Sequence, residues 1–270
     1  METQQVSTWN QLIDVIKDIQ RQYSTTMIDE FQQRNLVLYR GLADSNWQLD
    51  TTLERQSSKL WTLKSYYWQI WRCAPQIESF SESSWNLGSP ADVEKDLETC
   101  FRDYTVEVPH YEYWAYLRHH GFPSPLLDWS KSPYIALFFA LYEQSKADSA
   151  SIYAYIEMPS GTKGGIGGAP MISVQQPNIK THKRHFLQQS CYTVATELDQ
   201  EVKKNHRFVA HEQVFRMNYP DQDVLIKIIF PRNIRREALE ILNSYNINQF
   251  SLMQTEDALV QTLALEQLEL

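Results

Sequence analysis

The sequence predicts an α+β fold, on three observations. Apolar runs of strand length alternate with segments whose apolar residues follow helical spacing. The order of these elements shows no regular repeat of strand, helix and parallel strand, as a doubly wound fold requires. The chain has 270 residues, of which 43% are hydrophobic, so it can bury a large core. We therefore expect one α+β domain over residues 1–270.

Composition and charge exclude several classes of protein. The net charge of -8 disfavours non-specific binding to a phosphate backbone, although a local basic groove remains compatible with nucleic acid. Cys73, Cys100 and Cys191 are too few and too scattered for a disulfide framework or a thiolate metal site. The first residues have no signal-peptide features, and the apolar run 134–141 is too short to cross a bilayer. We expect a soluble, cytoplasmic protein with no membrane partner.

The N-terminal segment predicts an amphipathic helix. Ser7 is placed as its N-cap, and the residues that follow have 3.6-residue spacing. The apolar positions are Trp9, Leu12, Ile13, Ile16 and Ile19.

A buried strand is predicted next, at residues 36–39. It delivers Arg40 and Gly41 at its C-terminal end. Trp47 and Leu49 are expected to anchor the loop that follows, and a short helix begins near residue 53.

Residues 60–105 are rich in aromatic side chains. Such clustering is typical of stacking platforms for single-stranded nucleic acid, but aromatic residues more often fill cores, so we expect a packed helical insertion. Ser89 and Pro90 start a further helix, which leads to another around Trp114 and Leu117. The aromatic residues of the insertion are Trp61, Tyr66, Tyr67, Trp68, Trp71 and Trp85.

Residues 119–140, HHGFPSPLLDWSKSPYIALFFA, predict a turn, a short buried strand and a buried helix. Ser130 or Ser132 is placed as the helix N-cap, with Pro133 at the first helical position, where its missing N–H costs nothing. Asp128 and these two hydroxyls directly precede the most apolar helix of the chain. Because buried elements usually keep polar groups off their packed faces, we expect these polar side chains to have a role other than packing.

Three more strands are predicted, at residues 151–156, 191–195 and 224–230, and the last ends at Pro231. The C-terminal region beyond them is mixed. It includes a helix with apolar residues at Ile234, Ala238, Leu239 and Leu242.

Two motifs in this half argue against common ligand sites. The segment GTKGGIGGAP holds five of the eight glycines, at positions 161–168, but it lacks a Gly-Lys-Ser/Thr ending and an apolar helix behind it. We expect a mobile flap or linker there. His211 and Glu212 lack the second histidine of a zinc helix, so no metal site is expected.

Two blocks carry a resemblance to a known family. The first is Tyr-Arg-Gly at residues 39–41, followed by Trp47 and Leu49. The second spans residues 119–133 and continues through the apolar run to Ala140. Together they resemble the FRG domain, a bacterial family named for a Phe-Arg-Gly triplet, with tyrosine here in place of phenylalanine.

A third block, from Arg184 to Thr193, resembles the family's pattern of arginine, glutamine, glycine and an aromatic-threonine pair, with Ser190 in place of the glycine. The tail from Ile226 to Leu263 matches loosely and lacks the family's Phe-Pro-Asp. The resemblance therefore covers most of residues 35–260.

The order of these motifs is similar to that of ADP-ribosyltransferases. This similarity implies a split, mixed sheet with helical insertions and NAD as the substrate. Arg40 would offer a bidentate guanidinium fork to the pyrophosphate or a ribose hydroxyl, which lysine cannot reproduce. The hydroxyls and the imidazole would bind the nicotinamide ribose or carboxamide, and one aromatic ring would stack on the nicotinamide. The NAD-binding residues implied in this way are Arg40, Gly41, His120, Ser124, Trp129, Ser130 and Tyr192.

The same similarity implies Arg40, Asp128 and Gln188 as catalytic residues. Breaking the glycosidic bond builds positive charge on the ribose, which a nearby carboxylate stabilises. The best-known transferases open the late strand with glutamate, whereas Gln188 can hold a ribose hydroxyl but supplies no charge. Asp128 would take over this role, with Glu197 and Glu212 less well placed. The alternative is that catalysis has been lost.

Each residue also has a purely structural interpretation. Arg40 and Asp128 would form a buried ion pair, or Asp128 would cap the following helix. One of the adjacent His119 and His120 would be a core histidine with its hydrogen bonds satisfied. The three polar motifs, each at the end of a predicted strand, converge only if the fold builds a common cleft.

The leading hypothesis is an ADP-ribosyltransferase-like effector that uses NAD to modify a macromolecular acceptor, which is RNA, DNA or protein. The resemblance alone suggests a bacterial toxin or an anti-phage defence component, restrained by an antitoxin or chaperone. Two alternatives stay open. One is a non-catalytic module that binds a nucleotide or partner protein through the same cleft, and the other is a nucleic-acid-binding protein that uses Trp68 and Trp71.

Overall fold

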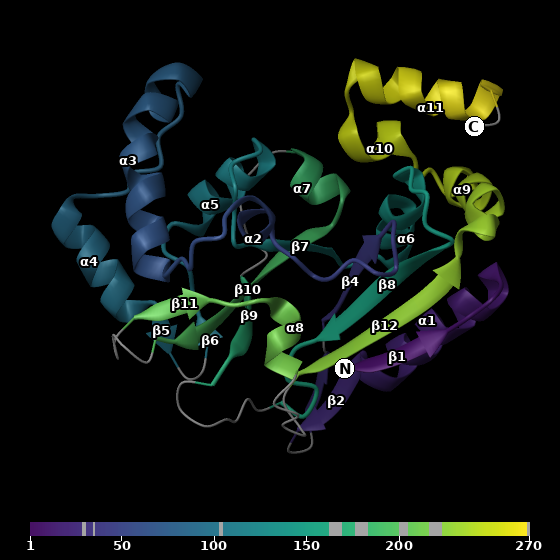
Figure 1. Cartoon of the computed structure of the whole chain (residues 1–270), viewed down its shortest axis with the longest axis horizontal. Coiled ribbons are helices and arrows are strands. Elements are labelled where there is room, and N and C mark those ends of the chain that lie inside the picture. Colours follow the sequence, from purple (N-terminus) through teal and green to yellow (C-terminus); the bar gives the residue numbers. More distant parts are fainter. Residues whose placement is uncertain are drawn as a thin grey trace.

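The structure is a computed structural model that describes residues 1–28, 31–34, 36–102, 105–161, 169–175, 183–199, 205–215 and 223–268. A mixed sheet of eight strands runs through this described part of the chain (Figure 1). Its strands are β1 (Glu2–Gln5), β4 (Val37–Leu42), β7 (Leu127–Ser130), β8 (Ser149–Ile156), β9 (Met171–Gln175), β10 (Ser190–Leu198), β11 (His206–Phe208) and β12 (Val224–Pro231). Two separate hairpins pair β2 (Thr25–Ile28) with β3 (Phe31–Arg34) and β5 (Phe101–Arg102) with β6 (Thr105–Val106).

Helices join and cover these strands, which confirms the α+β class. They are α1 (Trp9–Tyr23), α2 (Thr52–Gln56), α3 (Leu63–Ser81), α4 (Pro90–Thr99), α5 (Tyr111–His119), α6 (Pro133–Tyr142), α7 (Lys183–Leu187), α8 (His211–Val214), α9 (Arg235–Ser244), α10 (Gln249–Met253) and α11 (Glu256–Leu268), with a 3-10 turn, η2 (Arg232–Ile234), before α9. No helix in the described ranges is long and apolar enough to cross a membrane.

The sheet divides where β4 meets β7. Its order is β1-β12-β8-β4-β7-β10-β11, with β9 also on β10. β1 runs parallel to β12, and the other neighbours are antiparallel. β4 pairs with β8 over six residues, but with β7 only through Tyr39 and Ser130. The two halves of the sheet therefore diverge at this point. Polar groups at the ends of β4 and β7 are not used in pairing the two strands and are available for other partners.

The start of α6 follows the predicted capping pattern. Ser132 is its N-cap, with Oγ accepting from the amide of Ile135, and Pro133 is its first residue. Ser130 has a different role, described below. At α1 the prediction was one residue off, because Thr8 rather than Ser7 accepts the amide of Gln11.

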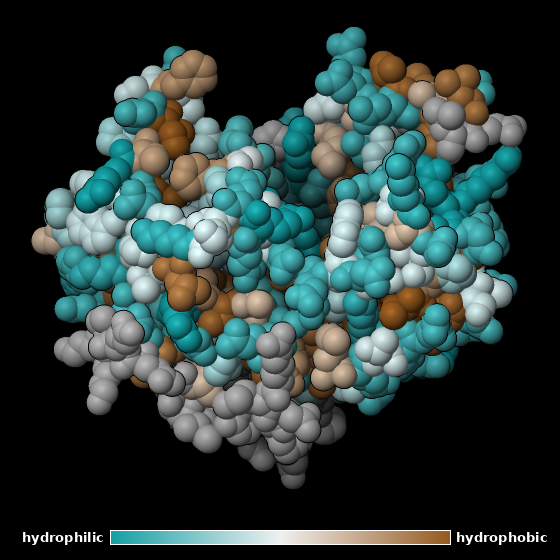
Figure 2. All heavy atoms as spheres, in the orientation of Figure 1, coloured by the Kyte–Doolittle hydropathy of each residue, from teal (hydrophilic) through white to brown (hydrophobic). Residues whose placement is uncertain are grey.

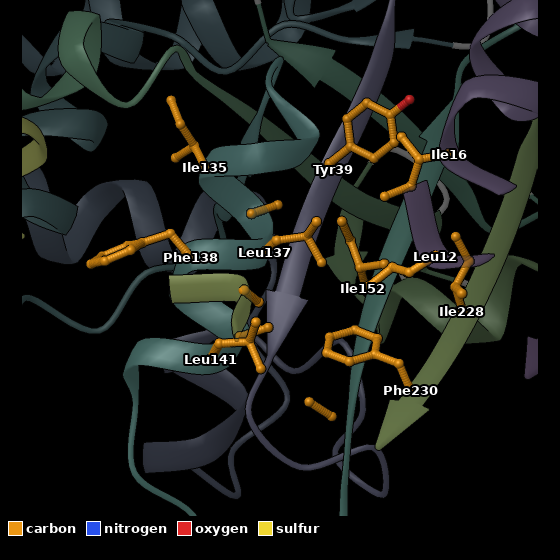
Figure 3. Packing of buried hydrophobic residues seen from close by; sticks show 14 of the residues in the cluster. Leu12, Ile16, Tyr39, Ile135, Leu137, Phe138, Leu141, Ile152, Ile228 and Phe230 are labelled. Carbon is orange, nitrogen blue, oxygen red and sulfur yellow. The ribbon is translucent and has the colours of Figure 1, made fainter. Parts of the chain in front are cut away.

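The two faces of the first half-sheet are buried by different groups of side chains, because alternate residues of a strand point to opposite faces. In β4, Val37 and Tyr39 belong to one cluster and Leu38 and Leu42 to another. The first cluster joins the sheet to α1, α6 and α9. Figure 3 shows its members Leu12, Ile16, Tyr39, Ile135, Leu137, Phe138, Leu141, Ile152, Ile228 and Phe230.

A third cluster forms the core of the aromatic insertion. Tyr66 and Tyr67 of α3 are buried against Trp114 of α5, with ring centroids 4.9 and 6.1 Å from its own. The cluster also includes Tyr192 and Val194, so it packs the insertion onto β10 of the second half-sheet. Figure 1 places α3 and α4 at the opposite end of the molecule from α10 and α11.

Two expectations about loops have different outcomes. Leu49 is buried and anchors its loop, but Trp47 is 42% exposed, so its predicted role as a second anchor is wrong. In the glycine-rich segment, residues 162–168 lie outside the described residues.

Candidate functional site

A pocket of about 840 Å³ lies where the two half-sheets separate. Side chains and main chain from β4, β7 and β10 line it, together with parts of α2, α5, α6, α7 and α10. Figure 2 shows a hollow between the part of the molecule that carries α3 and the part that carries α10 and α11, with mainly hydrophilic residues at its floor. A volume of this size is in the range of pockets that bind small molecules and cofactors.

The pocket wall contains a carboxylate bound by two guanidinium groups. Arg40 Nη1 donates to the main-chain oxygen of Asp128 at 2.7 Å and lies 3.7 Å from its Oδ2. Arg118, in the last turn of α5, donates from Nη2 to the same Oδ2. The Nε atoms of Arg40 and Arg118 are buried and have no hydrogen-bond partner within the described residues. Two positive charges therefore meet one negative charge, and donors remain unused.

The pKa values of this cluster follow from burial and charge. Burial lowers the pKa of the Arg40 guanidinium, and the carboxylate of Asp128 opposes this. Burial by itself would raise the pKa of Asp128, but the nearby charges of Arg118 and Arg40 outweigh it and hold that pKa below its ordinary value. Asp128 is therefore ionised at neutral pH, and its charge is already paired. The structural interpretation predicted an ion pair between Arg40 and Asp128, and this ion pair is present.

Strand alternation separates the roles of the residues in β7. Asp128 and Ser130 point to the pocket side, while Leu127 and Trp129 pack in the cluster on the other face. The indole N–H of Trp129 donates to Thr193 Oγ1 at 2.8 Å, and its ring lies 5.6 Å from that of Tyr155. Although Trp129 contributes to the pocket wall, its indole is committed to the core, so stacking on nicotinamide is not available to it.

Tyr192 lies opposite Asp128 in the pairing of β10 with β7 and therefore faces the pocket. Its hydroxyl is 2.9 Å from Nε2 of His119, which also lines the pocket. Burial raises the pKa of Tyr192 far above its ordinary value, so the hydroxyl keeps its proton. The ring of Tyr192 is 1% exposed and packs in the core of the insertion, 5.7 Å from the ring of His185, so stacking on nicotinamide is not available to it either, and the pair presents the imidazole of His119 at the pocket wall.

Gln188 lines the pocket from the end of α7, but its side chain is used elsewhere. Its amide nitrogen donates to the main-chain oxygen of Leu252 at 3.3 Å and contacts Met253 Sδ at 3.4 Å, so it joins α7 to α10. Its main-chain oxygen accepts the hydroxyl of Ser130 at 2.8 Å. Ser130 thus ties the end of β7 to α7.

The structure corrects two of the expected ligand residues. Ser124 is fully buried and is not part of the pocket wall, because its Oγ accepts the amide of Leu126 and its main chain is bonded to α2. His120 ends α5, is exposed and packs on Tyr116, outside the pocket. Its neighbour His119 lies at the site instead, because one residue turns a side chain about 100° around a helix.

Gly41 is in the pocket wall for a reason of packing. A Cβ built on it would lie 1.9 Å from the main-chain oxygen of Ala136, so only glycine lets β4 approach α6 this closely. The two carboxylates expected to be less well placed, Glu197 and Glu212, are not part of the pocket wall. Glu197 pairs with Arg207, and Glu212 accepts the hydroxyl of Tyr153 at 3.0 Å.

Sequence reasoning missed several residues that line the pocket. The cationic ones are Arg55 of α2, Arg118 of α5 and Arg184 of α7, and the acidic ones are Asp50 and Glu143. A usable signal existed for Arg184, which opens the third motif block, and for Arg118, which immediately precedes the His-His-Gly motif in the last turn of a predicted helix. No group of three histidine, cysteine or acidic side chains in the described ranges is placed to hold a metal ion.

Comparison with known proteins gives one result. Residues 35–149 match the FRG domain, which extends from β4 through α6 to the start of β8. The matched segment contains Arg40, Arg118 and Asp128, the ion-paired cluster of the pocket. No curated protein and no solved structure matches the chain.

Proposed function

Starting from an FRG domain over residues 35–149, we propose that the chain uses the pocket at the sheet division to bind NAD and transfer its ADP-ribosyl group to a macromolecule. The observation that carries this proposal is the pairing of Arg40 and Arg118 with the single carboxylate of Asp128. Arg55 and Arg184 line the same pocket. With Asp50, Asp128 and Glu143 in the same wall, four arginines face three carboxylates, and the positive charge in excess favours an anionic ligand group such as a pyrophosphate.

Each group has a task in this proposal. The guanidinium groups of Arg40 and Arg118, which line the pocket, bind the pyrophosphate, and Asp128 fixes the position of both. The imidazole of His119, held by the hydroxyl of Tyr192, is available for the nicotinamide end. The reaction breaks the bond between the ribose C1′ and the nicotinamide nitrogen, whose electron pair leaves with nicotinamide. The acceptor's nucleophile then bonds C1′ and releases its proton to solvent.

The developing charge on the ribose calls for a carboxylate close to C1′. Asp128 lines the pocket, but two guanidinium groups share its charge. Asp50 and Glu143 also line the pocket and are the remaining acidic candidates. Asp128 therefore acts mainly as a positioning residue in this proposal.

Incubation with NAD labelled in its adenine moiety tests the activity. Cellular RNA, DNA and lysate serve as acceptors, and released nicotinamide is measured in parallel. We expect transfer of label to one acceptor class, lost in Arg40→Ala. Absence of both transfer and nicotinamide release in the wild-type protein would refute the enzymatic proposal. A toxin or defence role belongs to the same proposal, and it predicts that expression arrests growth in wild type but not in Arg40→Ala.

A second candidate is a non-catalytic module that binds the nucleotide and signals through a partner. Two observations favour it. The charge of Asp128 is neutralised by its arginines, and the side chain of Gln188 is bound to α10 instead of facing a substrate. This candidate predicts saturable binding of NAD in calorimetry without release of nicotinamide.

A further inference from the structure

Trp47 is the exposed member of the eight tryptophans of the chain, all of which lie in the described ranges. It is 42% exposed, whereas the others are buried or half-buried. It also lines the pocket that contains the arginines. An exposed indole loses the burial that normally favours tryptophan, so its position calls for an explanation other than packing.

The loop holds this residue rigidly although its ring is exposed. The amide of Trp47 donates to the main-chain oxygen of Asp44 at 3.1 Å, and the amide of Asn46 donates to Asp44 Oδ1 at 2.8 Å. On the other side, Leu49 is buried and its amide donates to Glu212 at 3.3 Å. The main chain that carries the indole is therefore held in place, so a ligand that stacks on the ring has little backbone to order.

The neighbours of Trp47 in the sequence add hydrogen-bonding groups to the same wall. Asn46 and Gln48 are exposed and line the pocket, and their side-chain amides make no hydrogen bond within the described residues. An amide carries both a donor and an acceptor, which matches the amino group and ring nitrogen of adenine. A planar face flanked by two such amides is suited to a purine.

From this arrangement we infer that Trp47, with Asn46 and Gln48, forms the adenine subsite of the pocket. The inference rests on the proposed function and extends it, because it assigns the base end of the dinucleotide to the 46–48 loop and the pyrophosphate to the arginines. The site then selects nucleotides that carry adenine. The nicotinamide end, which bears a positive charge in NAD, is directed away from this loop towards Tyr192 and His119.

Calorimetry with three probes tests the inference: NAD, ADP-ribose and nicotinamide mononucleotide, which lacks adenine. We expect Trp47→Leu to weaken the binding of NAD and ADP-ribose by about tenfold, the effect of losing one stacked base. Its affinity for nicotinamide mononucleotide should stay unchanged. Trp47→Phe should recover most of the affinity because it keeps an aromatic face. Phe186→Leu is the matched control, since Phe186 is 84% exposed and is not part of the pocket wall.

The outcomes separate the two proposals. If wild type and Trp47→Leu bind NAD equally well, the adenine subsite is refuted while the NAD site stands. The same holds if the substitution weakens the binding of nicotinamide mononucleotide by the same factor as that of NAD. If wild type binds none of the three probes, both proposals fail. Because the indole is exposed, Trp47→Leu should keep the thermal unfolding midpoint of wild type, and this is checked first.

Discussion

Arg40 reaches from β4 across the division of the sheet and donates to the main-chain oxygen of Asp128 in β7 at 2.7 Å. The two strands share only one residue pair, so the guanidinium group takes the place of missing main-chain hydrogen bonds. The Arg40 and Arg118 side chains both line the pocket. One residue thus closes the gap between the half-sheets and contributes positive charge to the proposed ligand site.

Replacing Asp128 with asparagine should destabilise the protein at neutral pH. The variant leaves two guanidinium groups without their counter-charge, at a cost of about 2 kcal/mol in the free energy of unfolding. The carboxylate is 37% exposed, so water recovers part of the lost interaction. The pKa of Asp128 is lower in the folded protein than its ordinary value of 3.8, so the stabilisation is present above that pH and disappears as the pH falls through the folded-state pKa.

Urea unfolding of wild type and Asp128→Asn between pH 7 and pH 3 measures this difference. Asp50→Asn is the control, because it makes the same change in the same pocket at a residue without an ion pair among the described residues. A difference between wild type and Asp128→Asn that stays constant down to pH 3 would contradict the account.

Gly41→Ala should destabilise the protein by about 3 kcal/mol or more, because the new methyl group would lie 1.9 Å from the main-chain oxygen of Ala136. Gly121→Ala is the comparison. Gly121 has open space around it but a φ of +83°, so alanine there costs about 1 kcal/mol through backbone strain. Chemical denaturation of both variants should rank Gly41→Ala as the more damaging, and the opposite ranking would mean that β4 and α6 are not packed as described.

His211 should make stability fall at mildly acidic pH. It is fully buried, and Thr193, whose oxygen accepts the indole N–H of Trp129, is left to donate its hydroxyl proton to Nε2. Burial lowers the pKa of His211 to about 3, below its ordinary value of 6.5. The unfolded chain therefore takes up the proton first, which costs up to about 1.4 kcal/mol per pH unit below 6.5.

His211→Gln removes this titration. Its free energy of unfolding should depend less steeply on pH than that of wild type between pH 6.5 and pH 4, with the exposed His120→Gln as control. Parallel pH profiles for wild type and His211→Gln would show that the imidazole is not buried in its neutral form.

Gln188→Glu should have two opposite effects. A carboxylate cannot donate to the main-chain oxygen of Leu252, so the contact between α7 and α10 weakens by about 1 kcal/mol. The added negative charge at the pocket should raise the rate of nicotinamide release if the pocket cleaves NAD. Gln189→Glu makes the same change at the exposed neighbour and should have neither effect. If neither the wild type nor Gln188→Glu releases nicotinamide, the result favours the binding-module alternative.

The local elements could be predicted where the sequence carries a complete signal. Ser132 and Pro133 mark the start of α6, Ser89 and Pro90 mark α4, and the apolar runs mark β8 and β12. β1, the strand Glu-Thr-Gln-Gln, could not be found because it has no apolar residue. It exists through pairing with β12, more than 200 residues away in the sequence.

The site was predicted in part for a similar reason. Arg40 and Asp128 are the polar exceptions in apolar strands, and this marks them. The part played by Arg118 depends on the direction of α5 relative to β7, and the choice between His119 and His120 depends on the rotation of the helix end. Trp47 was misplaced because an aromatic residue near a buried Leu49 usually packs with it. These relations are set by tertiary structure, which residue spacing does not contain.

The central claim is that the arginines gathered at Asp128 form a binding site for the pyrophosphate of NAD. Calorimetric titration of NAD into wild type, Arg40→Lys and Arg118→Lys tests it most directly, because lysine keeps the charge and loses the bidentate fork. The account predicts saturable binding to wild type and at least tenfold weaker binding to both variants, each confirmed as folded by circular dichroism. Absence of NAD binding to wild type, or equal affinity in all three proteins, would contradict it.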